Sequence, residues 1–147
     1  MTPSTETRDL SALISRVLLA VLFIPSGIEK IPGFAGTVHY IAVNGVPLPE
    51  LAAVIGIVVE LGLGILLLVG YQTRWVALVF IVYCIVLAFI FHSYWRAPAA
   101  QAMGAQFNFY KNVGLAGGFF SILAWGAGGW SVDARRGAAR SDSLRAA

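Results

Sequence analysis

The chain has 147 residues, of which 59% are hydrophobic and only 12% are charged. A soluble domain with this composition would expose large apolar patches, so the surplus of apolar side chains predicts an integral protein of the lipid bilayer. The net charge of +3 comes from scattered basic residues, which form no aromatic-interleaved patch for a nucleic acid backbone, so we exclude a nucleic-acid-binding domain.

Four apolar stretches are long enough to cross a hydrocarbon core, which takes about 20 helical residues. We expect spanning helices at about residues 10–28, 51–69, 75–91 and 107–125. The first stretch has an alternative interpretation as a signal peptide, because Arg8 and Arg16 provide a basic flank. Pro25, Ser26 and Gly27 form no convincing small-x-small cleavage site, so we retain the span.

The connections and the basic residues predict how the helices are arranged. Only residues 70–74 join the second and third spans, which requires a tight antiparallel hairpin. Most of the 10 basic residues fall on one face of this arrangement: Arg8, Arg16, Arg74, Arg135, Arg136, Arg140 and Arg145. Only Lys30, Arg96 and Lys111 fall on the other face. Because cytoplasmic loops are enriched in Lys and Arg, we expect both termini in the cytoplasm.

The predicted fold class is therefore all-α, an integral membrane four-helix bundle with antiparallel helices. Residues 1–9 form a cytoplasmic N-terminus and residues 10–128 form the four-helix transmembrane domain. Residues 129–147 mix Arg, Ala, Ser and Asp without periodicity, and we expect them to be a disordered cytoplasmic tail.

A carboxylate in the middle of the second span is the first candidate site residue. Glu60 follows Glu50 by about 15 Å of helix, at 1.5 Å per residue, which places it near the bilayer midplane. Such a residue costs several kcal/mol and is a functional hypothesis by default. Gly56 and Gly64 lie on the same helical stripe, and small residues mark close helix packing, so Glu60 is expected to face the bundle interior.

Further polar residues are expected in the outer half of the bundle, above Glu60. They are Glu29 and Lys30 at the end of the first span, His92 at the end of the third, and Lys111 in the fourth. Lys111 shares a helix face with Gly114 and Gly118, and its flexible stem can reach towards Glu60 or Glu29. The pattern predicts a polar funnel that ends on Glu60. A structural Glu60–Lys111 pair that fixes helix register remains an open alternative.

Metal and cofactor signals are weak in this sequence. His39 and His92 share no helix face, so we expect no metal site. The single cysteine, Cys84, can form neither an internal disulfide nor a thiolate cage by itself. We therefore expect no built-in cofactor, and any redox chemistry would depend on a separately bound molecule such as a quinone. Catalytic residues are not identified.

Several runs resemble the DoxX family of small bacterial inner-membrane proteins: SGIEKIPGF at 26–34, VELGLGILLLVGYQTRWVAL at 59–78, FIFHSYW at 89–95, FNFYKNVGLAGGFF at 107–120 and GWSVD at 129–133. The resemblance implies a four-helix membrane subunit of the kind found in thiosulfate:quinone oxidoreductase, or a role in membrane redox homeostasis. Family motif positions matched here are Gly27, Glu29, Lys30, Glu60, Gly64, Gly70, His92, Lys111, Asn112 and Gly118. Asn112 thereby joins the candidate site.

Three functions follow as hypotheses. The first is a membrane subunit that binds a quinone and works with a soluble oxidoreductase subunit, in which Glu60, His92 and Lys111 supply protons and hydrogen bonds. The second is a small carrier for protons or weak acids, which would dimerise through the GxxxG pair formed by Gly114 and Gly118. The third is a scaffold without chemistry that holds a redox enzyme at the membrane.

Overall fold

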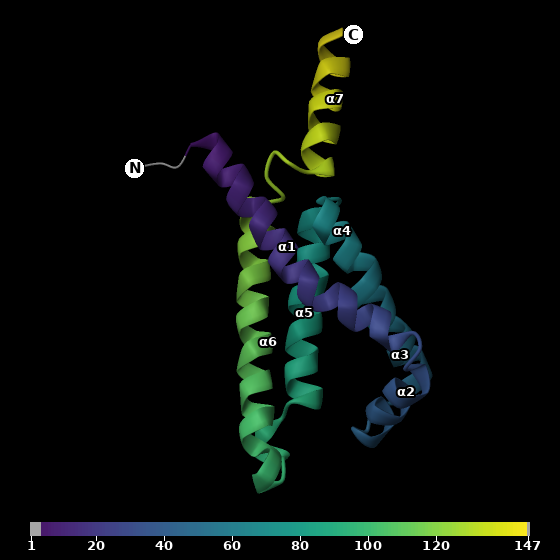
Figure 1. Ribbon diagram of the computed structural model, residues 1–147. Coiled ribbons are helices and arrows are strands. Elements are labelled where there is room, and N and C mark those ends of the chain that lie inside the picture. Colours follow the sequence, from purple (N-terminus) through teal and green to yellow (C-terminus); the bar gives the residue numbers. More distant parts are fainter. Residues whose placement is uncertain (1–3, 147) are drawn as a thin grey trace.

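The computed structural model describes residues 4–146, and this part of the chain consists of helices and their connections. In chain order the helices are α1 (Thr5–Lys30), α2 (Phe34–Val43), α3 (Pro49–Ile57), the π-helix η1 (Val58–Leu63), α4 (Gly64–Val69), α5 (Thr73–Phe91), the 3-10 helix η2 (Tyr94–Arg96), α6 (Ala99–Trp125) and α7 (Val132–Ala146). Helices α3, η1 and α4 follow one another without a break and form one long rod (Figure 1).

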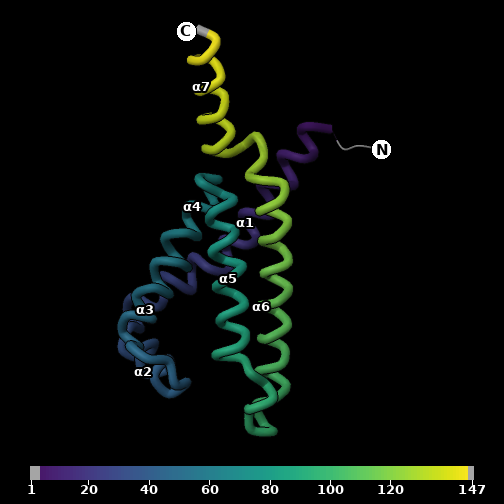
Figure 2. Tube along the Cα trace, turned by 180° about the vertical axis from the view of Figure 1, so that it is seen from behind, coloured from purple at the N-terminus to yellow at the C-terminus, as the bar shows by residue number. Residues whose placement is uncertain are grey.

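The long helices run alternately up and down the bundle (Figures 1 and 2). Helix α5 packs along α6, while α1 crosses them diagonally and packs against η1 and α4. The start of α1, the α4–α5 turn and α7 lie at one end, which we call the α7 end (Figure 1). The α2–α3 pair and the link between α5 and α6 lie at the other, the α2 end.

Within residues 4–146, three segments are long and apolar enough to cross a membrane, namely Thr5–Lys30, Pro49–Val69 and Thr73–Arg96. Helix α6 is a fourth candidate by its 27 residues, although Asn108, Lys111 and Asn112 make it less apolar. Two expected connections contain helix instead: α2 lies between the predicted first and second spans, and α6 begins at Ala99, eight residues before the predicted fourth span. Flanking polar residues can extend a helix beyond its apolar stretch because backbone hydrogen bonding does not depend on apolarity.

Three phenylalanines form the centre of the core. The ring of Phe80 on α5 lies 4.6 Å from that of Phe23 on α1 and is stacked 4.7 Å from that of Phe119 on α6, centroid to centroid. All three side chains are buried. Aromatic packing of this kind joins the three helices.

Glycines set the close approach of α1 to the α3–α4 rod. A Cβ on Gly27 would lie 2.7 Å from the backbone nitrogen of Leu61, and a Cβ on Gly64 would lie 2.9 Å from Cγ1 of Ile24. By contrast, a Cβ on Gly114 would meet nothing within 4 Å. The α1 contact therefore depends on Gly27 and Gly64, whereas Gly114 faces open space in this chain.

Arg16 is buried among backbone carbonyls and is not a flanking surface charge. The residue is only 1% exposed, and its guanidinium donates to the carbonyl oxygens of Leu68 at 2.8 Å and Trp130 at 2.6 Å. The last carbonyls of a helix lack intrahelical partners, so Arg16 satisfies one at the end of α4. It also ties the segment after α6 to the bundle.

Residues 132–146 form α7, which corrects the prediction of a disordered tail from residue 129. The carboxylate of Asp133 accepts hydrogen bonds from the backbone N–H groups of Gln72 and Thr73, at 2.8 and 2.9 Å, and from the Thr73 hydroxyl. It thereby caps the start of α5 from a distant part of the sequence. Composition alone could not reveal this anchor, because the partners lie about sixty positions away.

We predict that Gly27→Ala destabilises the protein while Gly114→Ala does not. The new methyl group at residue 27 would overlap the backbone of η1, and overpacking costs about 1–3 kcal/mol. At residue 114 the space is open and alanine is the better helix former, by up to about 1 kcal/mol. Thermal unfolding midpoints of both variants in the same detergent check this, and equal midpoints would contradict the close α1 contact.

We also predict a pH-dependent contribution from Asp133. Burial alone would raise the pKa of its carboxyl, but the hydrogen bonds from Thr73 and Gln72 and the charge of Arg136 outweigh burial and lower that pKa below 3.8. Because the pKa is lower in the folded state, the stabilisation is complete above the unfolded pKa and is lost as the pH falls through the folded one.

Asp133→Asn should therefore be less stable than the parent chain at pH 7, and the difference should shrink below about pH 5. Unfolding midpoints measured from pH 7 to pH 3 provide the check. Asp142→Asn removes the same charge from an exposed position of α7 and should leave the parent profile unchanged. A difference between Asp133→Asn and the parent that stays constant with pH would refute the capping role.

Candidate functional site

A cavity of about 470 Å³ lies between α1, α2 and α3 on one side and α5 and α6 on the other. Most of its lining is apolar, with side chains such as Leu22, Val86 and Ile90. The core residue Phe23 also lines it, and behind Phe23 the packed rings of Phe80 and Phe119 continue towards the α7 end. The cavity thus has an apolar wall and ends against the aromatic core.

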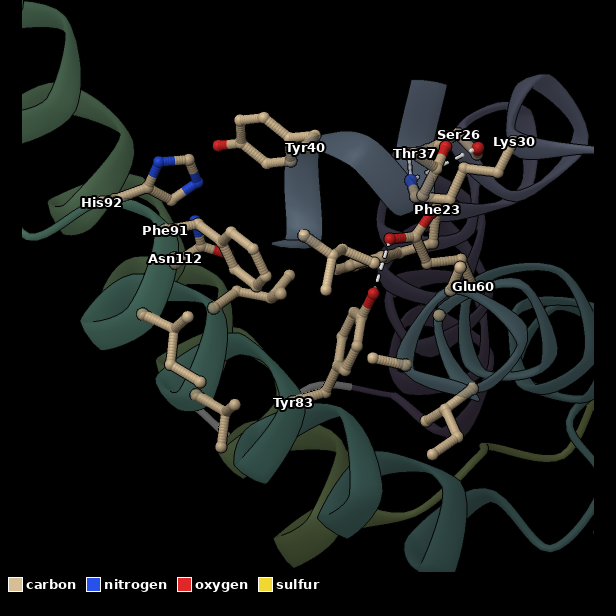
Figure 3. A pocket seen from close by; sticks show the side chains of 18 of the residues that line it. Phe23, Ser26, Lys30, Thr37, Tyr40, Glu60, Tyr83, Phe91, His92 and Asn112 are labelled. Atoms are coloured by element: carbon tan, nitrogen blue, oxygen red, sulfur yellow. Dashed lines mark hydrogen bonds and ion pairs between the residues drawn. The ribbon is translucent and has the colours of Figure 1, made fainter. Parts of the chain in front are cut away.

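Glu60 lies in this cavity and has two partners (Figure 3). The residue is 4% exposed. One carboxylate oxygen lies 2.6 Å from the ammonium nitrogen of Lys30, and the other accepts a hydrogen bond of 2.7 Å from the hydroxyl of Tyr83. Lys30 also donates to the Ser26 hydroxyl at 2.8 Å. Each carboxylate oxygen is therefore satisfied, as a charge in an apolar environment requires.

The π-helix η1 provides the local backbone for Glu60. It spans Val58–Leu63, so Glu60 is its third residue. A π-turn adds one residue to the helical turn, and such segments are rare and frequently found at functional sites. The widened turn also coincides with the close contact between Gly27 and Leu61, which brings the end of α1, and with it Lys30, towards Glu60.

A second group of polar side chains lines the cavity on α5 and α6. His92 and Asn112 lie across the cavity from the Glu60 cluster, which is Glu60 with its partners Lys30 and Tyr83 (Figure 3). Tyr40 of α2 lies near His92. Lys111 also lines the cavity and donates to the side chain of Asn108 at 2.9 Å. The ring of Tyr40 stacks on Phe91 with centroids 5.4 Å apart. The cavity is therefore polar on two opposite sides and apolar between them.

The structure brings together most of the residues that the sequence singled out, but in a different pairing. Glu60, Lys30, His92, Lys111 and Asn112 all line the one cavity. Lys30, rather than Lys111, makes the ion pair with Glu60. Glu29 is exposed and is absent from the cavity lining, because the helical step of 100° between neighbours turns it away when Lys30 faces inward.

Sequence analysis missed Tyr83 and the role of Ser26. Tyr83 lies in the middle of an otherwise apolar span, where its hydroxyl needs a hydrogen-bond partner. This requirement was a reason in the sequence to include Tyr83 in the candidate site. Ser26 lies four residues before Lys30, one turn along the same helix face. Both residues could have been included on these grounds, although neither spacing identifies Glu60 as the acceptor.

The groups available to a ligand are hydrogen-bonding and ionic. Within residues 4–146, no three His, Cys, Asp or Glu side chains are placed to hold a metal ion. The cavity offers an ammonium, a carboxylate and a phenol at one side and an imidazole and an amide at the other. Such an arrangement suits a mainly apolar molecule that carries polar atoms on opposite edges.

Comparison with known proteins agrees with this architecture. The DoxX family profile matches residues 11–93. Inner membrane protein YphA of Escherichia coli (strain K12) is 40% identical over 128 residues, which cover 87% of this chain and 91% of the relative. Inner membrane protein YqjF of the same organism is 37% identical over 128 residues, covering 87% and 93%.

No solved structure matches the chain. The family match spans more than half of the sequence and includes α1 through α5, with Lys30, Glu60 and Tyr83 among the matched positions. Both relatives are named as inner membrane proteins and align over nearly their whole length. The chain is therefore an inner-membrane protein that belongs to the DoxX family.

Proposed function

We propose that the cavity binds the head group of a membrane quinone and that the chain serves as the membrane subunit of a quinone-linked oxidoreductase. The observation that carries this proposal is the Lys30–Glu60–Tyr83 cluster facing a mainly apolar cavity of about 470 Å³. A quinone is a flat apolar ring with carbonyl oxygens on opposite edges. The two polar sides of the cavity match those two edges.

The residues would bind and orient the ring through complementary donors. Lys30 has three N–H groups, of which two bond Ser26 and Glu60, so it can donate on one side. Asn112 and His92 can donate on the other. Two-electron reduction of a quinone to a quinol takes up two protons, so protonatable groups beside both carbonyl oxygens are useful. Glu60 and Lys30 can hold and pass a proton on one side, and His92 can do so on the other. The electrons would come from a soluble oxidoreductase subunit.

The closed inner end of the cavity favours this reading over a carrier for protons or weak acids. A carrier needs a route to both membrane faces. Here the packed rings of Phe23, Phe80 and Phe119 stand between the cavity and the α7 end. Beyond them the buried Arg16 is bonded to backbone carbonyls. These contacts support a binding site rather than a continuous path towards the α7 end.

We predict that Glu60→Gln weakens quinone binding by about tenfold or more, because it removes the charge that holds Lys30 in place. Tyr83→Phe should weaken binding less, since it removes one neutral hydrogen bond to Glu60. Quenching of intrinsic tryptophan fluorescence by a short-chain ubiquinone, titrated into purified protein in detergent, measures the affinity. Mass spectrometry of an organic extract of the gently purified protein should also detect quinone.

Glu50→Gln is the matched control, because Glu50 is an exposed carboxylate at the start of the same rod. It should bind quinone like the parent chain. Unfolding midpoints of all variants establish that each is folded. If folded Glu60→Gln retains the parent affinity and the extract contains no quinone, the proposal fails. The chain would then be better explained as a scaffold.

We further propose that the α7 end faces the cytoplasm, so that both termini are cytoplasmic. The basic residues Arg74, Arg135, Arg136, Arg140 and Arg145 gather at this end of the chain's fold, and such enrichment favours the inner face. In a Cys84→Ser background, Ser141→Cys should react with an impermeant maleimide only in inverted vesicles. Ala100→Cys, near the α2 end, should react only in right-side-out vesicles. The reverse pattern would overturn the orientation.

A further inference from the structure

A second cavity, of about 410 Å³, lies at the α7 end, far from the Glu60 cluster. Its wall combines the start of α5, the link after α6 and the first turn of α7. Gln72, Arg74 and Trp75 contribute from the α5 side, and Asp133 and Arg136 from the α7 side. Two arginines from distant parts of the sequence thus face one cavity.

The arginines have donors to spare, whereas the single acid in the cavity is already occupied. Both carboxylate oxygens of Asp133 accept hydrogen bonds from Gln72 and Thr73. Arg74 makes one hydrogen bond, of 3.3 Å, to the carbonyl oxygen of Ala124. Arg136 lies over the ring of Tyr71, with its guanidinium carbon 5.1 Å from the centroid, and has no hydrogen-bond acceptor among residues 4–146. The cavity therefore favours an anion.

Tryptophans around the cavity indicate its depth relative to the bilayer. Trp75 is 68% exposed, Trp125 79% and Trp130 54%, and all three belong to this end of the bundle. Exposed tryptophans concentrate at the membrane–water interface, at the level of the lipid head groups. Trp75 belongs to the cavity wall itself. A lipid phosphate next to the protein would lie at this level.

We propose that this cavity is a binding site for the head group of an anionic phospholipid, with Arg74 and Arg136 holding the phosphate. Arginine is suited to the role because its planar fork can donate two hydrogen bonds to one phosphate. Arg135, Arg140 and Arg145 on α7 add a positive field near the surface, which attracts anionic lipid. A bound lipid would join α5 to α7 and stabilise the contact that Asp133 already makes. This site does not depend on the proposed quinone site.

The experiment compares lipids of different charge on the purified full chain in a neutral detergent. Phosphatidylglycerol should raise the unfolding midpoint in a saturable way, and phosphatidylcholine at the same concentration should not. The double variant Arg74→Gln/Arg136→Gln should weaken the apparent affinity for phosphatidylglycerol by about tenfold, as expected for lost charge-assisted hydrogen bonds. Native mass spectrometry of the same samples should show fewer retained phosphatidylglycerol molecules.

The matched control is Arg140→Gln/Arg145→Gln, which removes the same charge from exposed positions of α7. It should bind phosphatidylglycerol like the parent chain, apart from a small electrostatic loss. Arg74→Lys/Arg136→Lys keeps the charge but loses the fork, and its affinity should lie between the parent and the glutamine variant. Midpoints without lipid report whether each variant is folded.

Three results would overturn the proposal. The first is an equal effect of phosphatidylcholine and phosphatidylglycerol. The second is an equal loss of binding in the control and in the Arg74/Arg136 variant, which would reduce the effect to net charge. The third is an equal shift with inorganic phosphate alone, which would make the site one for free phosphate rather than for lipid.

Discussion

The ion pair between Lys30 and Glu60 is the interaction on which the cavity depends. A carboxylate in an apolar environment is costly unless both of its oxygens have hydrogen-bond or ionic partners. Here one oxygen pairs with the ammonium of Lys30, and the other accepts a hydrogen bond from Tyr83. These three residues come from α1, η1 and α5. The pair therefore fixes where three helices meet and leaves the space beside them open to a ligand.

Buried polar side chains have different kinds of bonding partner in the two parts of the bundle. At the α7 end, Arg16 and Asp133 bind backbone groups of the α4–α5 turn and of the segment after α6. Their partners are fixed parts of the fold, so they hold the structure together. Beside the cavity, Glu60 is bonded to the side chains of Lys30 and Tyr83. Backbone groups are thus the partners at the α7 end, and side chains are the partners at the cavity.

The proposed chemistry follows from that division. The aromatic core of Phe23, Phe80 and Phe119 separates the cavity from the α7 end, and the apolar lining suits a ligand that partitions into lipid. Hydrogen-bonding groups on opposite sides suit a ring with two polar edges. In the proposed function, a soluble oxidoreductase subunit delivers the electrons.

The sequence by itself determined the membrane location, the four long helical segments and most of the residues around the cavity, because hydrophobic length and a charge within an apolar run are local signals. These signals pointed to Glu60, Lys30, His92 and Lys111, and the family resemblance added Asn112. Only the tertiary structure decided that Lys30 and Tyr83 are the partners of Glu60, that Glu29 faces outward and that Asp133 anchors α7. Those pairings depend on the rotation of each helix about its axis and on the π-turn at Glu60, which arise from close packing between distant segments such as Gly27 and Leu61.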